Sequence, residues 1–91
     1  MKKIIYFAAT WCGPCRGLSP IMDELAFRVN VQKVDVDNSK DEVHKYHVKS
    51  VPTLVLLEDG NETKRLVGSQ TEKKLLNILI WYETFRIKRN N

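Results

Sequence analysis

Apolar residues recur along the chain with two different spacings, and these predict alternating strands and helices. Residues 4–8 form a continuous apolar run, which is typical of a buried strand. The following apolar positions are spaced three and four apart: Leu18, Ile21, Met22, Leu25 and Ala26. This spacing predicts one apolar face of a helix over residues 15–29, which Asn30 ends.

The second half of the chain continues the alternation. A valine-rich run predicts a strand over 31–36, parallel to the first through a right-handed crossover. A turn at 37–39 then leads into a short helix over 40–46. Strands are predicted over 53–57 and 62–67, and the hairpin signal Asp59-Gly60 makes them antiparallel. The last helix opens at Thr71, and its apolar positions are Leu75, Leu76, Leu79, Ile80, Tyr82 and Phe85.

Length and hydropathy limit the classes of protein that this chain can form. Its 91 residues predict a single domain over 1–91, and a hydrophobic content of 43% is ordinary for a globular fold. No run approaches the roughly 20 apolar residues that span a bilayer. Lys2-Lys3 and the short apolar run after them lead directly into a cysteine motif, which cleavage of a signal peptide would destroy. We therefore expect a cytoplasmic protein without a membrane partner.

The net charge of +4 is spread along the sequence and does not predict nucleic-acid binding. The only local excess is Arg86, Lys88 and Arg89 near the C-terminus. Cations there complement the negative end of a helix dipole. A nucleic-acid site would need aromatic interleaving or a long basic stripe, and the sequence has neither.

Two cysteines three positions apart are the strongest chemical signal. The segment from Trp11 through Cys12, Gly13 and Pro14 to Cys15 lies at a predicted strand-to-helix corner. Free N–H groups and the helix dipole at such a corner lower a thiol pKa below its usual value of about 8.5. The thiolate is the nucleophile in disulfide exchange, so Cys12 can form a mixed disulfide and Cys15 can resolve it. A purely structural staple is the weaker interpretation, because closing so short a loop removes little chain entropy.

His44 and His47 raise the alternative of a zinc site shared with the two cysteines. Their two-residue separation and their distance along the chain from Cys15 fit zinc-finger patterns poorly. We therefore predict no metal site and interpret both histidines as surface or helix-packing residues.

These motifs together resemble the thioredoxin family in order and spacing. The segment from Trp11 to Cys15 matches the family's active-site motif residue for residue. The other matching positions are Pro20, Lys33, Asp37, Val51-Pro52-Thr53, Asp59-Gly60 and Val67-Gly68. The resemblance implies an α/β protein with a minimal thioredoxin fold. Its four-stranded mixed sheet would have the order 2-1-3-4 and be flanked by three helices.

The resemblance also implies roles for the matching residues. Cys12 would be the exposed attacking thiol and Cys15 the resolving thiol, with Gly13 and Pro14 supporting them. Pro52 would follow a cis peptide bond, in a loop with Val51 that offers backbone groups to a substrate peptide. Trp11 and Gly68 would form part of a flat apolar patch that receives client proteins.

Two departures from the family pattern change these expectations. Only three residues precede the first strand, so the family's usual first strand and helix would be missing, as in compact thioredoxins of some phages and archaea and in glutaredoxins. Tyr6 stands where the family has a buried aspartate, and Ala8 stands where it has a tryptophan, whereas Lys33 keeps the lysine's place. Because a tyrosine stays neutral, we expect the thiolate to form more easily and Cys15 activation to be slower or water-mediated. Lys33 is expected to turn outward or to hydrogen-bond the Tyr6 phenol.

The function that follows is reduction of protein disulfides by a monomer with no bound cofactor beyond its own redox-active Cys12–Cys15 disulfide. By family analogy, electrons would come from a thioredoxin reductase, a flavoprotein that uses NADPH, and clients would include ribonucleotide reductase. The location would be the cytoplasm, or the host cytoplasm for a phage-encoded chain. Two alternatives remain. A glutaredoxin-like reductant is less favoured by Trp11 and by Gly-Pro between the cysteines, and a redox-independent binding subunit of a larger assembly would not need the thiols.

Overall fold

The computed structural model describes the backbone of residues 1–89 and the side chains of residues 1–83. Seven elements follow in order: β1 (Lys2–Ala8), α1 (Gly13–Leu25), β2 (Val31–Asp35), α2 (Lys40–Lys45), β3 (Thr53–Glu58), β4 (Asn61–Val67) and α3 (Glu72–Arg89). The strands form one sheet in the order β2-β1-β3-β4, with β1 and β2 parallel and the other neighbours antiparallel. The predicted sheet order, strand directions and helix number are confirmed.

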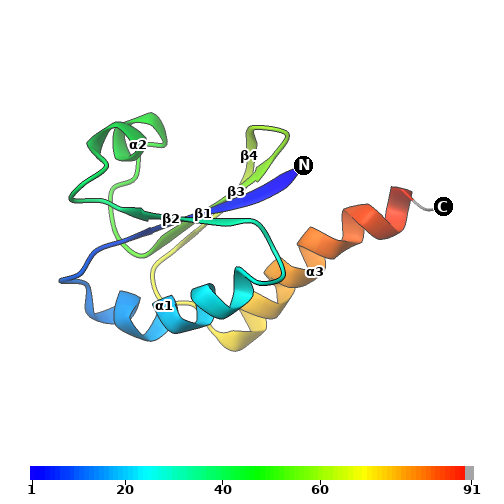
Figure 1. Ribbon diagram of the computed structural model, residues 1–91, viewed down its shortest axis with the longest axis horizontal. Coiled ribbons are helices and arrows are strands. Elements are labelled where there is room, and N and C mark those ends of the chain that lie inside the picture. Colours follow the sequence, from blue (N-terminus) through cyan, green and yellow to red (C-terminus); the bar gives the residue numbers. More distant parts are fainter. Residues whose placement is uncertain (90–91) are drawn as a thin grey trace.

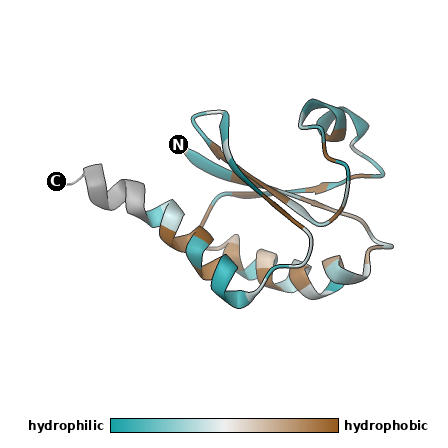
Figure 2. Ribbon diagram, turned by 180° about the vertical axis from the view of Figure 1, so that it is seen from behind, coloured by the Kyte–Doolittle hydropathy of each residue, from teal (hydrophilic) through white to brown (hydrophobic). Residues whose placement is uncertain are grey.

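The helices lie on both faces of the sheet. In Figure 1, α1 and α3 lie along one face and α2 lies on the other. Hydrophobic residues are concentrated along the sheet and on parts of the helices beneath it (Figure 2). This layering gives the protein two apolar layers, one on each side of the same strands.

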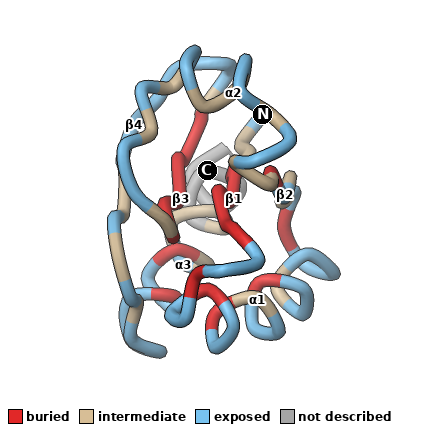
Figure 3. The backbone as a smooth tube through the Cα atoms, turned by 90° about the vertical axis from the view of Figure 1, so that its left-hand side faces the viewer, coloured by how far each residue is buried: buried red, intermediate tan, exposed pale blue. Residues whose placement is uncertain are grey.

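Strand β1 is buried on both faces because helices cover both sides of the sheet. Alternate residues of the strand point to opposite sides, so they pack into two different apolar layers. Ile4, Tyr6 and Ala8 pack into the layer shared with α1 and α3, which also contains both cysteines. Ile5 and Phe7 pack into the layer beneath α2. The buried backbone of β1 in the middle of the molecule is visible in Figure 3. A continuous apolar run is therefore what the central strand of this sheet requires.

The prediction for the first helix was wrong at both ends. Helix α1 begins at Gly13, because Cys12 provides its N-cap, and it ends at Leu25. Beyond Leu25 the backbone makes hydrogen bonds from Phe27 N to Glu24 O (3.1 Å) and from Arg28 N to Leu25 O (2.9 Å). These two bonds span three residues and end the regular helix, although one four-residue bond, from Val29 N to Leu25 O (3.0 Å), still follows.

In α3 the apolar face differs in part from the predicted one. Among residues 72–83 of this helix, Leu75 and Ile78 are the buried ones, whereas Leu76 and Ile80 are exposed. Ile78 was missed, because the periodicity was assigned to the neighbouring positions. Phe85, Arg86, Lys88 and Arg89 lie outside the described side chains. Within the described residues, no helix combines the length and apolar character needed to cross a membrane.

Candidate active site

Cys12 and Cys15 form a disulfide at the start of α1, immediately beyond the end of β1. Their Cα atoms are 5.3 Å apart. The Cys12 backbone is extended, and its Sγ accepts a hydrogen bond from the Cys15 N–H at 3.2 Å. Pro14 lies in the first helical positions, where its missing N–H leaves no helix bond unmade. The sulfur of Cys12 thus occupies the N-cap position, where helix amides favour negative charge.

The expectation of an exposed attacking cysteine was wrong for this oxidised state. Cys12 is only 4% exposed and Cys15 only 2%. The Cys12 sulfur is turned inward because it is bonded to Cys15 and capped by the Cys15 amide. Gly13 and Pro14, between the cysteines, are both exposed.

The predicted cis bond before Pro52 is confirmed. The carbonyl of Pro52 accepts a hydrogen bond from the Gly68 N–H at 2.9 Å, which joins this loop to the end of β4. Gly68 has a φ of +87°, a conformation that favours glycine. Val51 packs against the core cluster that contains both cysteines. Within the described backbone (1–89) and side chains (1–83), the backbone N–H and C=O of Val51 have no hydrogen-bond partner.

Trp11 is 65% exposed, although it lies next to a buried cysteine. Its indole Nε1 donates a hydrogen bond of 2.8 Å to Oδ2 of Asp37, which follows the end of β2. This bond holds the ring across the loops at the carboxyl ends of β1 and β2. Val67, beside Gly68, is also largely exposed at 58%.

Tyr6 is fully buried and points toward the helix that carries Cys15. Its hydroxyl is 2.8 Å from Oγ of Ser19 and donates to the Cys15 carbonyl at 3.3 Å. Burial raises the pKa of Tyr6 above 10, partly offset by the hydrogen bond to Ser19 and assisted by the negative charge of Asp23. The side chain is therefore neutral near pH 7, as predicted.

Lys33 does not hydrogen-bond the Tyr6 phenol, so that alternative was wrong. Tyr6 and Lys33 are register partners on β1 and β2, and the Lys33 Nζ lies 5.9 Å from the centroid of the Tyr6 ring. The phenol oxygen instead has Ser19 Oγ and the Cys15 carbonyl as its partners. Lys33 is exposed, but its ammonium stays beside the aromatic ring.

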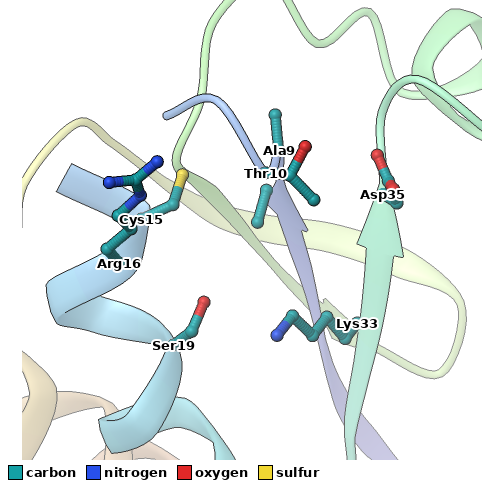
Figure 4. A pocket seen from close by; sticks show the side chains of 8 residues that line it. Ala9, Thr10, Cys15, Arg16, Ser19, Lys33 and Asp35 are labelled. Atoms are coloured by element: carbon teal, nitrogen blue, oxygen red, sulfur yellow. The ribbon is translucent and has the colours of Figure 1, made fainter. Parts of the chain in front are cut away.

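A cavity of about 460 Å³ lies beside Cys15, between the start of α1 and the ends of β1 and β2. Its lining residues are Ala8, Ala9, Thr10, Cys15, Arg16, Ser19, Lys33 and Asp35. Figure 4 shows Cys15, Arg16 and Ser19 on the helix side, with Lys33 and Asp35 across from them on β2. The small side chain of Ala8 contributes only a methyl group here.

The comparisons with known proteins agree with this geometry. The thioredoxin family model matches residues 1–80. The chain is 40% identical over 79 residues to a thioredoxin of Chlamydia pneumoniae, a match that covers 84% of this chain and 78% of the relative. A thioredoxin of Staphylococcus aureus is 37% identical over 81 residues, covering 85% and 78%.

Solved structures give the same result. A mutant thioredoxin from Halobacterium salinarum superposes with a TM-score of 0.81 at 38% identity, covering 89% of this chain and 74% of that one. The thioredoxin of Fasciola hepatica gives a TM-score of 0.81 at 37% identity, covering 89% and 80%. The chain belongs to the thioredoxin family. With its paired cysteines, it is a dithiol thiol–disulfide oxidoreductase with protein-disulfide reductase activity, which implies disulfide-bearing clients and a reductase in general.

Two residues at this thioredoxin site have contacts that the sequence did not reveal. Ser19 holds the Tyr6 hydroxyl, and Asp37 holds the Trp11 indole. Ser19 lies one helical turn after Cys15, and this spacing could have placed it on the same face. Asp37 was recognised as a matching family position, but nothing in the sequence indicated that it pairs with Trp11.

The histidines lie apart from the cysteine site, on and just after α2. The ring centroids of His44 and His47 are 6.4 Å apart. Across the part of the chain that the structure describes, no group of three or more histidine, cysteine, aspartate or glutamate residues is arranged to hold a metal ion.

Proposed function

We propose that Cys12 attacks the disulfide of a client protein and that Cys15 resolves the product. The Cys12 thiolate forms a bond to one client sulfur, and the other client sulfur leaves as a thiolate that takes a proton from solvent. The Cys15 thiol then loses its proton and attacks Cys12. The Cys12–Cys15 disulfide forms, and the second client thiol is released. Two electrons thus pass from the enzyme dithiol to the client disulfide.

One observation supports this order above all, the hydrogen bond from the Cys15 amide to the Cys12 sulfur at 3.2 Å. This bond and the helix N-terminus stabilise negative charge on Cys12 and not on Cys15. The first cysteine is therefore the better nucleophile at neutral pH and also the better leaving group.

Clients would bind beside the disulfide through main-chain and apolar contacts. The backbone N–H and C=O of Val51 have no partner within residues 1–89 and could pair with an extended client segment, as a strand edge does. Pro52 and Gly68 fix this loop through the bond from Gly68 N to Pro52 O. Exposed Trp11 would supply apolar contact area.

The cellular setting of the proposal follows from the family. The protein would act as a cytoplasmic monomer with no cofactor beyond its own disulfide. Its electrons would come from a flavoprotein thioredoxin reductase that uses NADPH, and ribonucleotide reductase would be among its clients. A glutaredoxin-like reductant would instead take electrons from a small thiol, and a redox-independent binding subunit would retain its role without either cysteine.

The assignment is tested with two single variants and insulin as the client. Cys15→Ser should accumulate a stable mixed disulfide through Cys12, because the resolving thiol is gone. Cys12→Ser should form far less of this adduct, and both variants should lose turnover. Mass spectrometry of the trapped adduct identifies the sulfur that reacts first. Adduct formation mainly through Cys15 would contradict the proposed order. Complementation in cells by the double variant would favour the binding-subunit alternative.

A further inference from the structure

A groove of about 680 Å³ lies between the C-terminal half of α1 and the first half of α3. The two helices run beside each other beneath the sheet (Figure 3). Apolar side chains from both helices line the groove. Leu25 and Leu79 are half-buried, whereas Ile21 and Leu76 remain 40% and 60% exposed. Exposed apolar surface that is gathered in a concave site marks a place where another molecule binds.

Phe27 stands at the edge of this groove, two residues beyond the end of α1. Its side chain is 90% exposed, the highest value among the large hydrophobic residues of the described side chains (1–83). A ring that is so exposed does not fill the groove of its own chain. Covering a phenylalanine removes about 150–250 Å² from water. One face of the protein thus carries a projecting apolar ring and, next to it, an apolar recess.

Charges of both signs lie on the rim of the same groove. Arg28 follows Phe27, and Glu24 and Glu72 stand on α1 and α3. The three charged side chains are exposed, and none of them forms an ion pair within residues 1–83. A partner with charge of a single sign would be repelled by part of this rim. A partner that carries both signs on one apolar face avoids this repulsion.

A second copy of this chain is such a partner. In a two-fold symmetric contact the same patch lies on both subunits, so a ring beside a recess meets its complement twice. We propose that two copies of the protein associate through this groove. Phe27 of each copy lies in the partner's groove, and Arg28 of each copy pairs with the partner subunit's Glu72.

The contact is small, which sets its strength. Two phenylalanine rings and the surfaces that they cover amount to roughly 800–1,200 Å² in total, at the low end of specific interfaces. Contacts of this size are typical of transient complexes, so we expect a Kd on the order of 10–100 µM. The monomer of the proposed function is therefore the dilute form, and the dimer forms as the concentration rises.

The dimer leaves the disulfide accessible to clients. Cys12 and Cys15 lie at the N-terminal end of α1, whereas the groove begins at Ile21. At a rise of about 1.5 Å per residue, Ile21 lies roughly 9 Å beyond Cys15 along the helix. The inference adds an interaction surface to the proposed dithiol function and does not depend on it.

Analytical ultracentrifugation of the oxidised protein at low salt tests the inference. Samples from about 5 to about 500 µM bracket the expected Kd. The weight-average mass should rise with concentration from that of one chain toward that of two. Denaturing electrophoresis without a reductant confirms that no intermolecular disulfide joins the copies.

Phe27→Asp tests whether the ring enters the partner's groove. It would bring a charge to an apolar recess and should raise the Kd at least about tenfold. Because Phe27 is 90% exposed, the variant keeps its fold, which circular dichroism checks, and its reduction of insulin in dilute solution should equal that of the wild type. Lys49→Glu reverses an exposed charge outside the groove and should change the Kd by less than about twofold.

Two charge reversals test the symmetry of the contact. Arg28→Glu and Glu72→Arg should each raise the Kd about threefold or more, because like charges then face each other at both ends of the interface. In an equimolar mixture the two variants should associate about as tightly as the wild type, since each contact again joins opposite signs. This recovery is expected only where Arg28 of one copy meets the partner's Glu72.

Three results would overturn the inference. A wild-type protein that stays monomeric at about 500 µM would show that the groove does not bind a second copy and would leave it to a helix of another protein. Self-association that Phe27→Asp does not weaken would place the contact on another face. A mixture of the two charge variants that associates no better than either variant alone would refute the two-fold arrangement.

Discussion

Removal of the Tyr6 hydroxyl tests the most unusual contact at this site. Tyr6→Phe keeps the buried ring and deletes the oxygen that lies 2.8 Å from Ser19 Oγ and 3.3 Å from the Cys15 carbonyl. A neutral intramolecular hydrogen bond contributes about 0.5–1.5 kcal/mol net. Ser19 can recover a water partner because it lines an open cavity, and the Cys15 carbonyl keeps its place in the helix. We therefore expect a loss of ~1 kcal/mol in the free energy of unfolding.

The loss is measured by urea unfolding of the oxidised proteins. For a domain of this size, ~1 kcal/mol corresponds to a fall of about 4–8 °C in Tm. The urea midpoint should fall by ~0.5–1 M with an unchanged slope. Ser19→Ala provides the matched deletion of the other partner, and the double variant closes a thermodynamic cycle.

The cycle determines whether the contact between Tyr6 and Ser19 causes the loss of stability. If Tyr6 and Ser19 stabilise each other, Ser19→Ala should cost less in the Tyr6→Phe background than in the wild type, with a coupling of ~0.5–1 kcal/mol. If the losses in unfolding free energy of the two single variants simply add up in the double variant, Tyr6 and Ser19 act independently. A loss above about 3 kcal/mol would show that the ring itself had shifted, since a single neutral hydrogen bond does not account for it.

Two other predictions concern pH and backbone conformation. Because burial raises the pKa of Tyr6 in the folded state, its contribution to stability should be complete below about pH 10. It should be lost as the pH rises further, so the stability difference between wild type and Tyr6→Phe should shrink above about pH 10. A stability difference that grew with rising pH would contradict a raised Tyr6 pKa in the folded state. Gly68→Ala should destabilise by about 1–2 kcal/mol through its φ of +87° alone, since no atom lies within 4 Å of the added Cβ. Gly17→Ala inside α1 is the matched control and should stabilise by up to about 1 kcal/mol in thermal unfolding, and equal losses for the two would contradict the argument.

The sequence predicted the fold well because its strongest patterns are local. The apolar run of β1, the period of α1 and the turn at Asp59-Gly60 each describe one element or one connection, and each is found. The resemblance supplied the sheet order and the cis bond at Pro52, which no local pattern contains. The end of α1 was misplaced because Ala26 extends the apolar period, although three-residue hydrogen bonds begin at the next residue, Phe27.

The site was predicted in its residues but not in all of its contacts. The spacing of Cys12 and Cys15 was sufficient to place both at the start of a helix. By contrast, the burial of Cys12 depends on where its sulfur points. The partners of the Tyr6 hydroxyl lie on α1, and they depend on how that helix packs against β1. The space left by Ala8 arises from three elements together, and a single position does not reveal it.

The position of β1 in the sheet has a consequence for how the protein is made. β1 is synthesised before β2 and β3, the two strands between which it lies, so neither of its lateral partners exists when it emerges from the ribosome. The second partner is complete only at Glu58, long after both thiols have been synthesised. Until Glu58 has been made, the nascent chain therefore carries two cysteines beside an apolar strand whose pairing is incomplete, and such exposed apolar surface favours aggregation.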